Sequence, residues 1–319
     1  MNYRRASFVG ALILSLAAGG CALVLANSID RDTVRSVPVS QASQTESTKS
    51  SLPAKMPDGT NTGVPPGTAL SEYTGPMSID TANTVIDGKI IRGALVIRAK
   101  NVRITRSQII GTVSNDEHSV DTSFTIADSL VEAGDKLQTG ISSRDFVATR
   151  VHVIGGNRSI LCFRNCVVEY SYVHGQMTDE SGKAHESGIR MSQGSTIRFN
   201  TIACDAPDIP PDAGCSAALT GYGDFEPVQN NLIEGNVFVH GSGGFCAYGG
   251  SSGANGAKPF GAEAANIRFI NNVWQRGTSP GDKGVPVCGH WGPITDFNSS
   301  RPGNVWSGNK WDDGTQLNP

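Results

Sequence analysis

A short apolar motif returns eight times in this sequence, at intervals that suit the turns of a solenoid. In seven copies a Ser or Asn stands three residues after one apolar position, here called the anchor, and in the third copy Val151 takes that place. Neighbouring anchors lie 20 to 22 residues apart in the first copies and 29 to 37 residues apart in the later ones. Such a repeat is typical of chains that stack one supersecondary unit on the next. The anchors are Ile104, Ile126, Ala148, Val168, Ile197, Ile233, Phe269 and Trp306.

The alternation around each anchor indicates a β-strand with one buried side. Residues two apart on a strand face the same way, so these apolar side chains point into a common interior. Asn tolerates the left-handed conformation and bonds the backbone locally, which suits it to the corner that follows. The repeat therefore predicts an all-β, right-handed parallel β-helix of about eight coils, because a β-sandwich does not require Ser or Asn at one fixed phase. The later corner residues should stack as a ladder of amides: Asn200, Asn236, Asn272 and Asn309.

A second set of short apolar segments precedes the later anchors and predicts a second parallel sheet of the solenoid. These segments are residues 160–162, 188–191, 216–219, 244–248 and 285–288. Loop insertions flank this sheet in the C-terminal half, before it at 175–186, 203–214 and 275–284, and after it at 221–229, 249–265 and 289–302. Loops on both flanks of one sheet form walls, so we expect the sheet to be the floor of a groove.

The coils that carry Asn, together with the runs GVPPGT at 63–68 and TVIDGK at 84–89, resemble right-handed parallel β-helix proteins of the pectate-lyase-like superfamily. The closing run 301–314 is similar to a group of exported actinobacterial β-helix repeat proteins. The resemblance covers about residues 57–316. It implies that a polysaccharide lies along the floor sheet, since many members cleave or epimerise polysaccharides, whereas others are viral or adhesive surface proteins. No catalytic residue is carried over, because no signature of a characterised lyase or hydrolase matches, and a shared fold does not define a function.

The N-terminal segment has the features of an export signal. Arg4 and Arg5 precede an apolar run, and small residues follow, so residues 1–26 are expected to be a signal peptide or a membrane anchor. Residues 27–57 are rich in Ser, Thr and Gln and predict a flexible linker. The folded β-helix domain should occupy residues 58–319. We expect a chain that is secreted or held at the extracellular face of the cell membrane. A membrane tether through the N-terminus is one of the two alternatives.

Six cysteines remain once Cys21 is set aside with the export segment. An even number in an exported chain favours disulfides over metal ligation. Proximity in sequence suggests one of the fifteen pairing schemes that six cysteines allow. The suggested pairs are Cys162–Cys166, Cys204–Cys215 and Cys246–Cys288.

Composition narrows the range of partners. The net charge is −3, with no basic excess, so nucleic acid is not an expected partner. We expect a monomer whose partner is a polysaccharide. The spaced carboxylates of Asp205, Asp208 and Asp212 are a candidate Ca²⁺ site. A surface loop stapled by Cys204 and Cys215 is the preferred interpretation of that stretch, so no cofactor is expected.

Two carboxylates at the edges of neighbouring coils are the candidates for hydrolysis. A glycoside hydrolase needs a proton donor and a second carboxylate across the bond, and Glu186 and Asp224 would supply them. The alternative is that each carboxylate is merely solvated or forms a turn in a Gly-rich loop.

Lyase or epimerase chemistry needs a base at a sugar carbon and a positive group for a uronate. Arg190, with His185, Tyr248 or His290, would meet that need. Arg190 has the alternative of a structural ion pair with Glu186 or Asp224.

Aromatic residues near the floor complete the set of candidates. Tyr222, Tyr248 and Trp291, with His290 beside them, are predicted to bind substrate, because flat apolar rings match the C–H faces of sugars. The alternative is that Tyr248 and Trp291 only pack loops onto the sheet. The leading functional hypothesis is an enzyme that cleaves or modifies an extracellular polysaccharide, as lyase, hydrolase or epimerase. The second is a glycan-binding or envelope-structural protein without catalysis.

Overall fold

A computed structural model describes residues 53–251, 258–278 and 287–319 of this chain. The predicted export segment and residues 27–52 of the predicted linker lie outside the described residues. Within the described ranges, no helix is long and apolar enough to cross a membrane. The described part of Ser50–Pro319 forms one compact unit.

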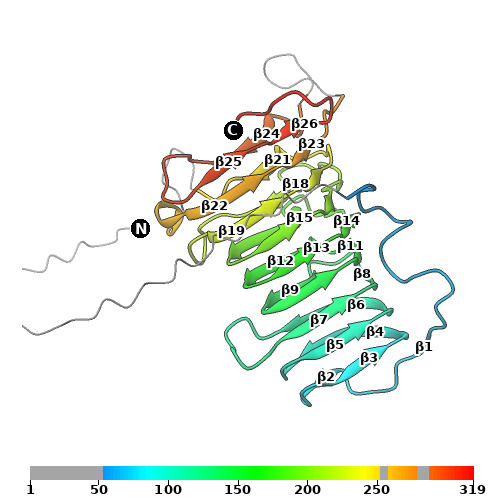
Figure 1. The fold of residues 1–319 in the computed structure, drawn as a ribbon. Coiled ribbons are helices and arrows are strands. Elements are labelled where there is room, and N and C mark those ends of the chain that lie inside the picture. Colours follow the sequence, from blue (N-terminus) through cyan, green and yellow to red (C-terminus); the bar gives the residue numbers. More distant parts are fainter. Residues whose placement is uncertain (1–52, 252–257, 279–286) are drawn as a thin grey trace, which may run out of the picture. The chain divides into compact units, whose positions relative to one another are not determined.

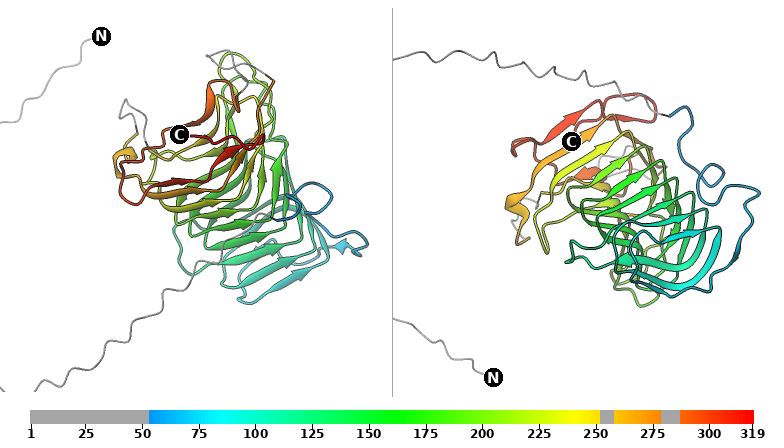
Figure 2. Two further views of the ribbon diagram at one scale, coloured as in Figure 1. Left: turned by 45° about the horizontal axis from the view of Figure 1, so that its top comes forward. Right: turned by 60° about the horizontal axis from the view of Figure 1, so that its bottom comes forward.

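This unit is a parallel β-helix, as the repeat predicts, and its strands are stacked coil upon coil (Figures 1 and 2). The strands lie on three faces, and all pairings between named strands are parallel. The anchor face consists of β3 (Val85–Asp87), β5 (Val102–Thr105), β7 (Phe124–Ala127), β10 (Phe146–Thr149), β13 (Val167–Glu169), β16 (Thr196–Arg198), β19 (Gln229–Glu234), β22 (Ala265–Ile270) and β25 (Val305–Ser307).

The two other faces share the long strands β4 and β6, which bend from one face to the next. The middle face consists of β1 (Ser71–Glu72), the first parts of β4 (Lys89–Ile97) and β6 (Gln108–Asn115), β8 (Leu130–Gly134), β11 (His152–Gly155), β14 (Tyr172–His174), β17 (Thr201–Ile202), β20 (Val237–Phe238), β23 (Val273–Trp274) and β26 (Lys310–Trp311). The floor face consists of β2 (Ser78–Ile79), the last parts of β4 and β6, β9 (Thr139–Arg144), β12 (Arg158–Arg164), β15 (His185–Gln193), β18 (Gly214–Thr220), β21 (Phe245–Tyr248) and β24 (Gly292–Thr295). A single 3₁₀ turn, Gly261–Glu263, lies in a loop of the described chain.

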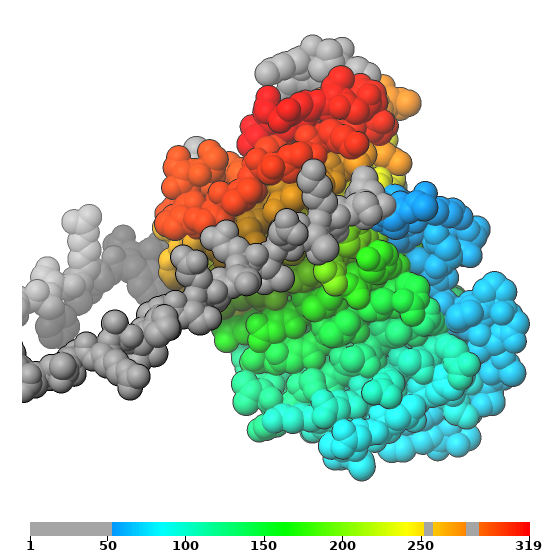
Figure 3. Space-filling view, viewed as in Figure 1, coloured from blue at the N-terminus to red at the C-terminus, as the bar shows by residue number. Residues whose placement is uncertain are grey.

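The predicted anchors pair with one another directly along the anchor face. Ile104 pairs with Ile126, and the same alignment continues through all later anchors to Phe269 and Trp306. Ile86 on β3 pairs with Ile104, so the described solenoid has one more coil than the eight predicted. The space-filling view shows the coils as successive bands of colour in chain order (Figure 3).

The interior is the apolar column that the alternation predicts. In β5, Val102 and Ile104 are fully buried while Arg103 between them is exposed. Side chains at equivalent positions stack from coil to coil, as Phe124 does on Phe146 with ring centroids 5.2 Å apart. Burial of this column supplies the stability that a single coil lacks.

The predicted amide ladder is confirmed, and it is fully buried. Asn200 Nδ2 donates to Asn236 Oδ1 at 2.9 Å, Asn236 Nδ2 to Asn272 Oδ1 at 3.0 Å, and Asn272 Nδ2 to Asn309 Oδ1 at 3.0 Å. The backbone N–H of each donor residue binds the same Oδ1. In the earlier coils serine hydroxyls accept the equivalent hydrogen bond from the preceding coil, as when Ser107 N donates to Ser129 Oγ at 3.1 Å.

The residue that turns the corner is not the one predicted. The left-handed residue stands immediately before the ladder position, as in Arg106, Arg150, Phe199 and Asn271. The ladder side chain must point inward to reach the next coil, so its neighbour takes the turn and points outward. Several of these outward residues form ion pairs between coils, such as Arg150 Nε with Asp128 Oδ1 at 2.6 Å.

Two of the three predicted disulfides are present. Cys204–Cys215 and Cys246–Cys288 are bonded, and Cys288 lies ahead of β24 and not in a strand. Residues 285 and 286 of the strand predicted at 285–288 lie outside the described residues. The proposed Cys162–Cys166 bond is wrong, because both residues are free thiols buried in the core. Cys166 Sγ instead contacts the carbonyl oxygens of Ser143 at 3.6 Å and Arg164 at 3.5 Å. Burial raises the pKa of the Cys166 thiol well above its ordinary value, which keeps it protonated.

We expect Asn236→Ala to lower the free energy of unfolding by about 3 kcal/mol, because it leaves the buried amides of Asn200 without their acceptor. Denaturant titration of the full-length variant measures this loss. Asn157→Ala is the matched control, since the Asn157 side chain has no hydrogen bond with any described residue, and its effect should stay within about 0.5 kcal/mol. Equal losses of unfolding free energy for the two substitutions would show that the ladder does not stabilise the fold.

Candidate functional site

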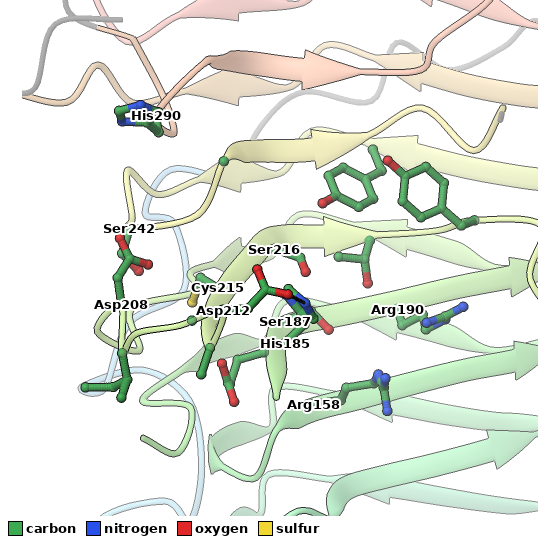
Figure 4. A pocket seen from close by; sticks show the side chains of 18 of the residues that line it. Arg158, His185, Ser187, Arg190, Asp208, Asp212, Cys215, Ser216, Ser242 and His290 are labelled. Atoms are coloured by element: carbon green, nitrogen blue, oxygen red, sulfur yellow. Dashed lines mark ion pairs between the residues drawn. The ribbon is translucent and has the colours of Figure 1, made fainter. Parts of the chain in front are cut away.

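The floor face carries a cavity of about 760 Å³ over its C-terminal half (Figure 4). Its floor is formed by residues of β12, β15, β18 and β21, which are neighbouring strands. All eight residues predicted to be catalytic or substrate-binding line it: His185, Glu186, Arg190, Tyr222, Asp224, Tyr248, His290 and Trp291. Described residues of five of the six predicted insertions line this cavity, and residues 252–257 and 279–284 of the insertions lie outside the described residues.

Two loops form the walls of the cavity. One is the segment that precedes β18, where Asp208 and Asp212 line the cavity and the Cys204–Cys215 bond closes the loop. The other is the segment before β24, which brings His290 and Trp291 to the same, amino-terminal edge of the floor strands, over later coils (Figure 4). Backbone hydrogen bonds from His290 N to Gly243 O and from Trp291 N to Gly244 O, both 2.8 Å long, hold this second wall against the segment that leads into β21.

Glu186, at the start of β15, is a buried carboxyl without a partner. Its side chain is 0% exposed, and neither carboxyl oxygen has a partner at full hydrogen-bond geometry within the described structure, although the backbone amides of Glu186 and Gly214 lie close by. Burial raises the pKa of Glu186 to about 7, and Asp179 adds to the rise, while the backbone amides of Glu186 and Gly214 and the ring of His185 oppose it. A carboxyl of this kind gains and loses its proton near neutral pH, as proton-transfer groups in enzymes do.

Asp224 has the opposite environment. Arg190 Nη2 lies 2.6 Å from Asp224 Oδ2, and Lys258 Nζ lies 2.6 Å from Oδ1. Burial raises the pKa of Asp224, but the hydrogen bonds from Lys258 and Arg190 outweigh it and the pKa falls below its ordinary value. Asp224 is therefore ionised at neutral pH, and both of its oxygens are already paired.

Glu186 and Asp224 lie toward opposite ends of the floor. Glu186 pairs with Cys215 at the amino end of the strands, whereas Arg190 pairs with Thr220 four residues further along. Four strand residues span about 13 Å. In Figure 4 the guanidinium of Arg190 points away from His185, so Asp224, which binds it, lies further still from Glu186.

The aromatic residues form two groups on the cavity surface. The rings of Tyr222 and Tyr248 lie 4.6 Å apart, and burial raises both of their pKa values, so the phenols remain protonated donors and are poor bases. Trp291 is 57% exposed, with its ring 5.8 Å from that of Phe245. The Trp291 ring lies so close to Gly244 that a Cβ there would meet it at 2.4 Å, which explains the glycine.

The three aspartates of the candidate Ca²⁺ site do not converge. Asp212 Oδ2 lies 3.3 Å from His185 Nε2, while Asp205 Oδ1 accepts a hydrogen bond from Gly175 N at 2.7 Å. Across the described part of the chain, no group of three or more His, Cys, Asp or Glu is arranged to hold a metal ion. The loop is held by the Cys204–Cys215 bond and by these contacts.

Sequence analysis missed Arg158, Ser187 and Lys258, which also line the cavity. Arg158 is the first residue of β12, two positions before Ile160, and pairs with Ser187 of β15. The strand predicted at 160–162 already pointed to Arg158. Extending that strand by two residues toward the N-terminus places Arg158 at the cavity. Lys258 follows a stretch outside the described residues, and nothing in its neighbourhood in the sequence points to Asp224.

No family model, no curated protein and no solved structure matches this chain. The fold and the site nevertheless define its class: a parallel β-helix protein with a walled cavity on one face of the solenoid.

The raised pKa of Glu186 makes stability depend on pH. Because the folded-state pKa of about 7 exceeds the ordinary value of 4.5, the protonated carboxyl stabilises the fold below 4.5, and this stabilisation is lost as the pH rises through 7. We expect Glu186→Gln, which does not titrate, to exceed the wild type by roughly 2–3 kcal/mol at about pH 8 and to match it at about pH 4.5. Denaturant unfolding across this pH range measures the difference. Glu234→Gln, on the anchor face, is the matched control, and a difference independent of pH would contradict the assignment.

Proposed function

We propose that this chain is an exported β-helix protein that acts on an extracellular polysaccharide in the cavity of the floor face. The observation that carries the proposal is the buried, unpartnered Glu186 beside a cavity that exposed and half-buried aromatic rings also line. The cavity lies along stacked strands, which suits a long polymer more than a compact ligand.

The aromatic groups support sugar binding. The exposed ring of Trp291 and the paired rings of Tyr222 and Tyr248 offer apolar surface, and the two phenols are hydrogen-bond donors. Lys258 Nζ lies 5.0 Å from the centre of the Tyr222 ring, which fixes the orientation of that ring.

Among the three predicted chemistries, the geometry favours a lyase or an epimerase over a hydrolase. Hydrolysis needs two carboxyls roughly 5–9.5 Å apart, whereas Glu186 and Asp224 lie toward opposite ends of the floor and Asp224 is paired with two cations. Proton abstraction needs one group with a pKa near neutrality, and Glu186 has it. In this proposal Glu186 transfers the proton.

A second candidate is a glycan-binding or envelope-structural protein without catalysis. One observation favours it: both carboxyl oxygens of Glu186 are shielded from solvent, so a bound sugar would need the floor to rearrange before reaching them. The aromatic groups need no such change.

The remaining proposals concern lineage and location. The parallel β-helix supports membership of the pectate-lyase-like superfamily, which we propose on the fold alone. The two disulfides favour an oxidising compartment and so support the proposed extracellular location. We also propose that the protein acts as a monomer.

The full-length chain incubated with a panel of plant and bacterial polysaccharides tests the enzyme proposal. A lyase produces ultraviolet absorbance of an unsaturated uronide together with new reducing ends, and an epimerase changes the sugar composition without either. We expect Glu186→Gln to lower the rate at least about 100-fold while binding is retained. Glu234→Gln should leave the rate unchanged.

Reducing ends without absorbance would contradict the choice of lyase over hydrolase. No reaction, with retention on an immobilised polysaccharide that Trp291→Ala weakens, would favour the binding protein. Absence of both reaction and retention would overturn the proposed function.

A further inference from the structure

Arg158 is a cation in the cavity without a partner. Its side chain makes no ion pair or hydrogen bond with any residue that the structure describes. Burial lowers the pKa of Arg158, and the nearby Arg190 adds to the decrease, yet a guanidinium remains charged at any physiological pH. Keeping such a charge partly out of water without a counter-ion is unfavourable, unless a ligand supplies the counter-ion.

The neighbours of Arg158 are unsatisfied as well. Ser187 pairs with Arg158 across β12 and β15, is 2% exposed, and its hydroxyl has no hydrogen-bond partner (Figure 4). Glu186, the preceding residue, has none either. Arg158 and Ser187, at paired positions of neighbouring strands, and Glu186, the adjacent residue of β15, thus all lack partners, although buried polar groups are normally paired.

The other two cationic side chains of the cavity are already in ion pairs. Arg190 and Lys258 both bind Asp224. Around Asp224 three cations, Arg158 included, thus face one carboxylate, whereas the carboxylates of Asp208 and Asp212 belong to the cavity wall. Arg164, further along β12, lies outside the cavity lining and pairs with Glu226 at 2.6 Å.

We propose that Arg158 and Ser187 form a subsite for one anionic substituent of the polysaccharide. The guanidinium binds two oxygens of a carboxylate, sulfate or phosphate group. The Ser187 hydroxyl, shielded from solvent like the Glu186 carboxyl, donates to the same group once the floor rearranges. This inference rests on the proposed function and adds to it the residues that bind the charged substituent. It transfers to Arg158 the role that sequence analysis gave to Arg190, which is held by Asp224.

The test compares two polymers with one backbone, polygalacturonate and its methyl ester, on the full-length chain. We expect the charged polymer to bind roughly ten- to a hundredfold more tightly, and Arg158→Met to abolish that preference. Ser187→Ala should weaken binding of the charged polymer a few-fold. Arg198→Met is the matched control, because Arg198 pairs with Glu169 on the anchor face and should not affect binding.

Dextran sulfate and poly(glycerol phosphate) are measured alongside, and the polymer whose binding depends most on Arg158 identifies the anion. Thermal unfolding confirms that each variant is folded, and Arg158→Lys, which keeps the charge but not the two-pronged geometry, should retain part of the preference. Equal binding of both galacturonate polymers, with no effect of Arg158→Met on any anionic polymer, would overturn the subsite and leave the proposed function intact. Failure of every polysaccharide to bind would overturn both.

Discussion

The structure depends on hydrogen bonds that run from each coil to the next. Backbone pairing aligns the anchors from Ile86 to Trp306, and the buried amides from Asn200 to Asn309 fix the same alignment at the corner. A slip by one residue would turn every apolar side chain outward and leave each amide without its acceptor. Because the register is so strongly determined, long loops can be inserted between strands without disturbing the coils that carry them.

The cavity is a consequence of where those insertions occur. The floor strand β15 holds His185, Glu186 and Arg190 at fixed intervals, and the loops bring other residues above them. Two different electrostatic environments result on one floor. Asp224 is ionised between two cations, whereas Glu186, further toward the amino end, is buried without a partner. Divergent pKa values of carboxyls that line one cavity are a recognised feature of functional sites.

Sequence analysis succeeded where one residue type at one position carries the information. The Ser or Asn after each anchor predicted the coils and the ladder, and clustered loops predicted which residues would share a cavity. It was less successful where the answer depended on side-chain direction. The left-handed corner lies one residue before the ladder, and Cys162 and Cys166 point into the core as free thiols. Spacing alone contains no information about either direction.

The sequence by itself determined the fold class, the alignment of the coils and the face that carries the loops, because an apolar alternation with a polar corner has only one way to stack. Only the tertiary structure decided which polar side chains are buried and which have a partner. Whether Arg190 is paired, Arg158 is unpaired and Glu186 is buried depends on residues of neighbouring coils and loops, such as Asp224, that are distant in the chain. Burial and charge act through space, so a residue's proton affinity and its freedom to bind a ligand become defined only when the coils are stacked.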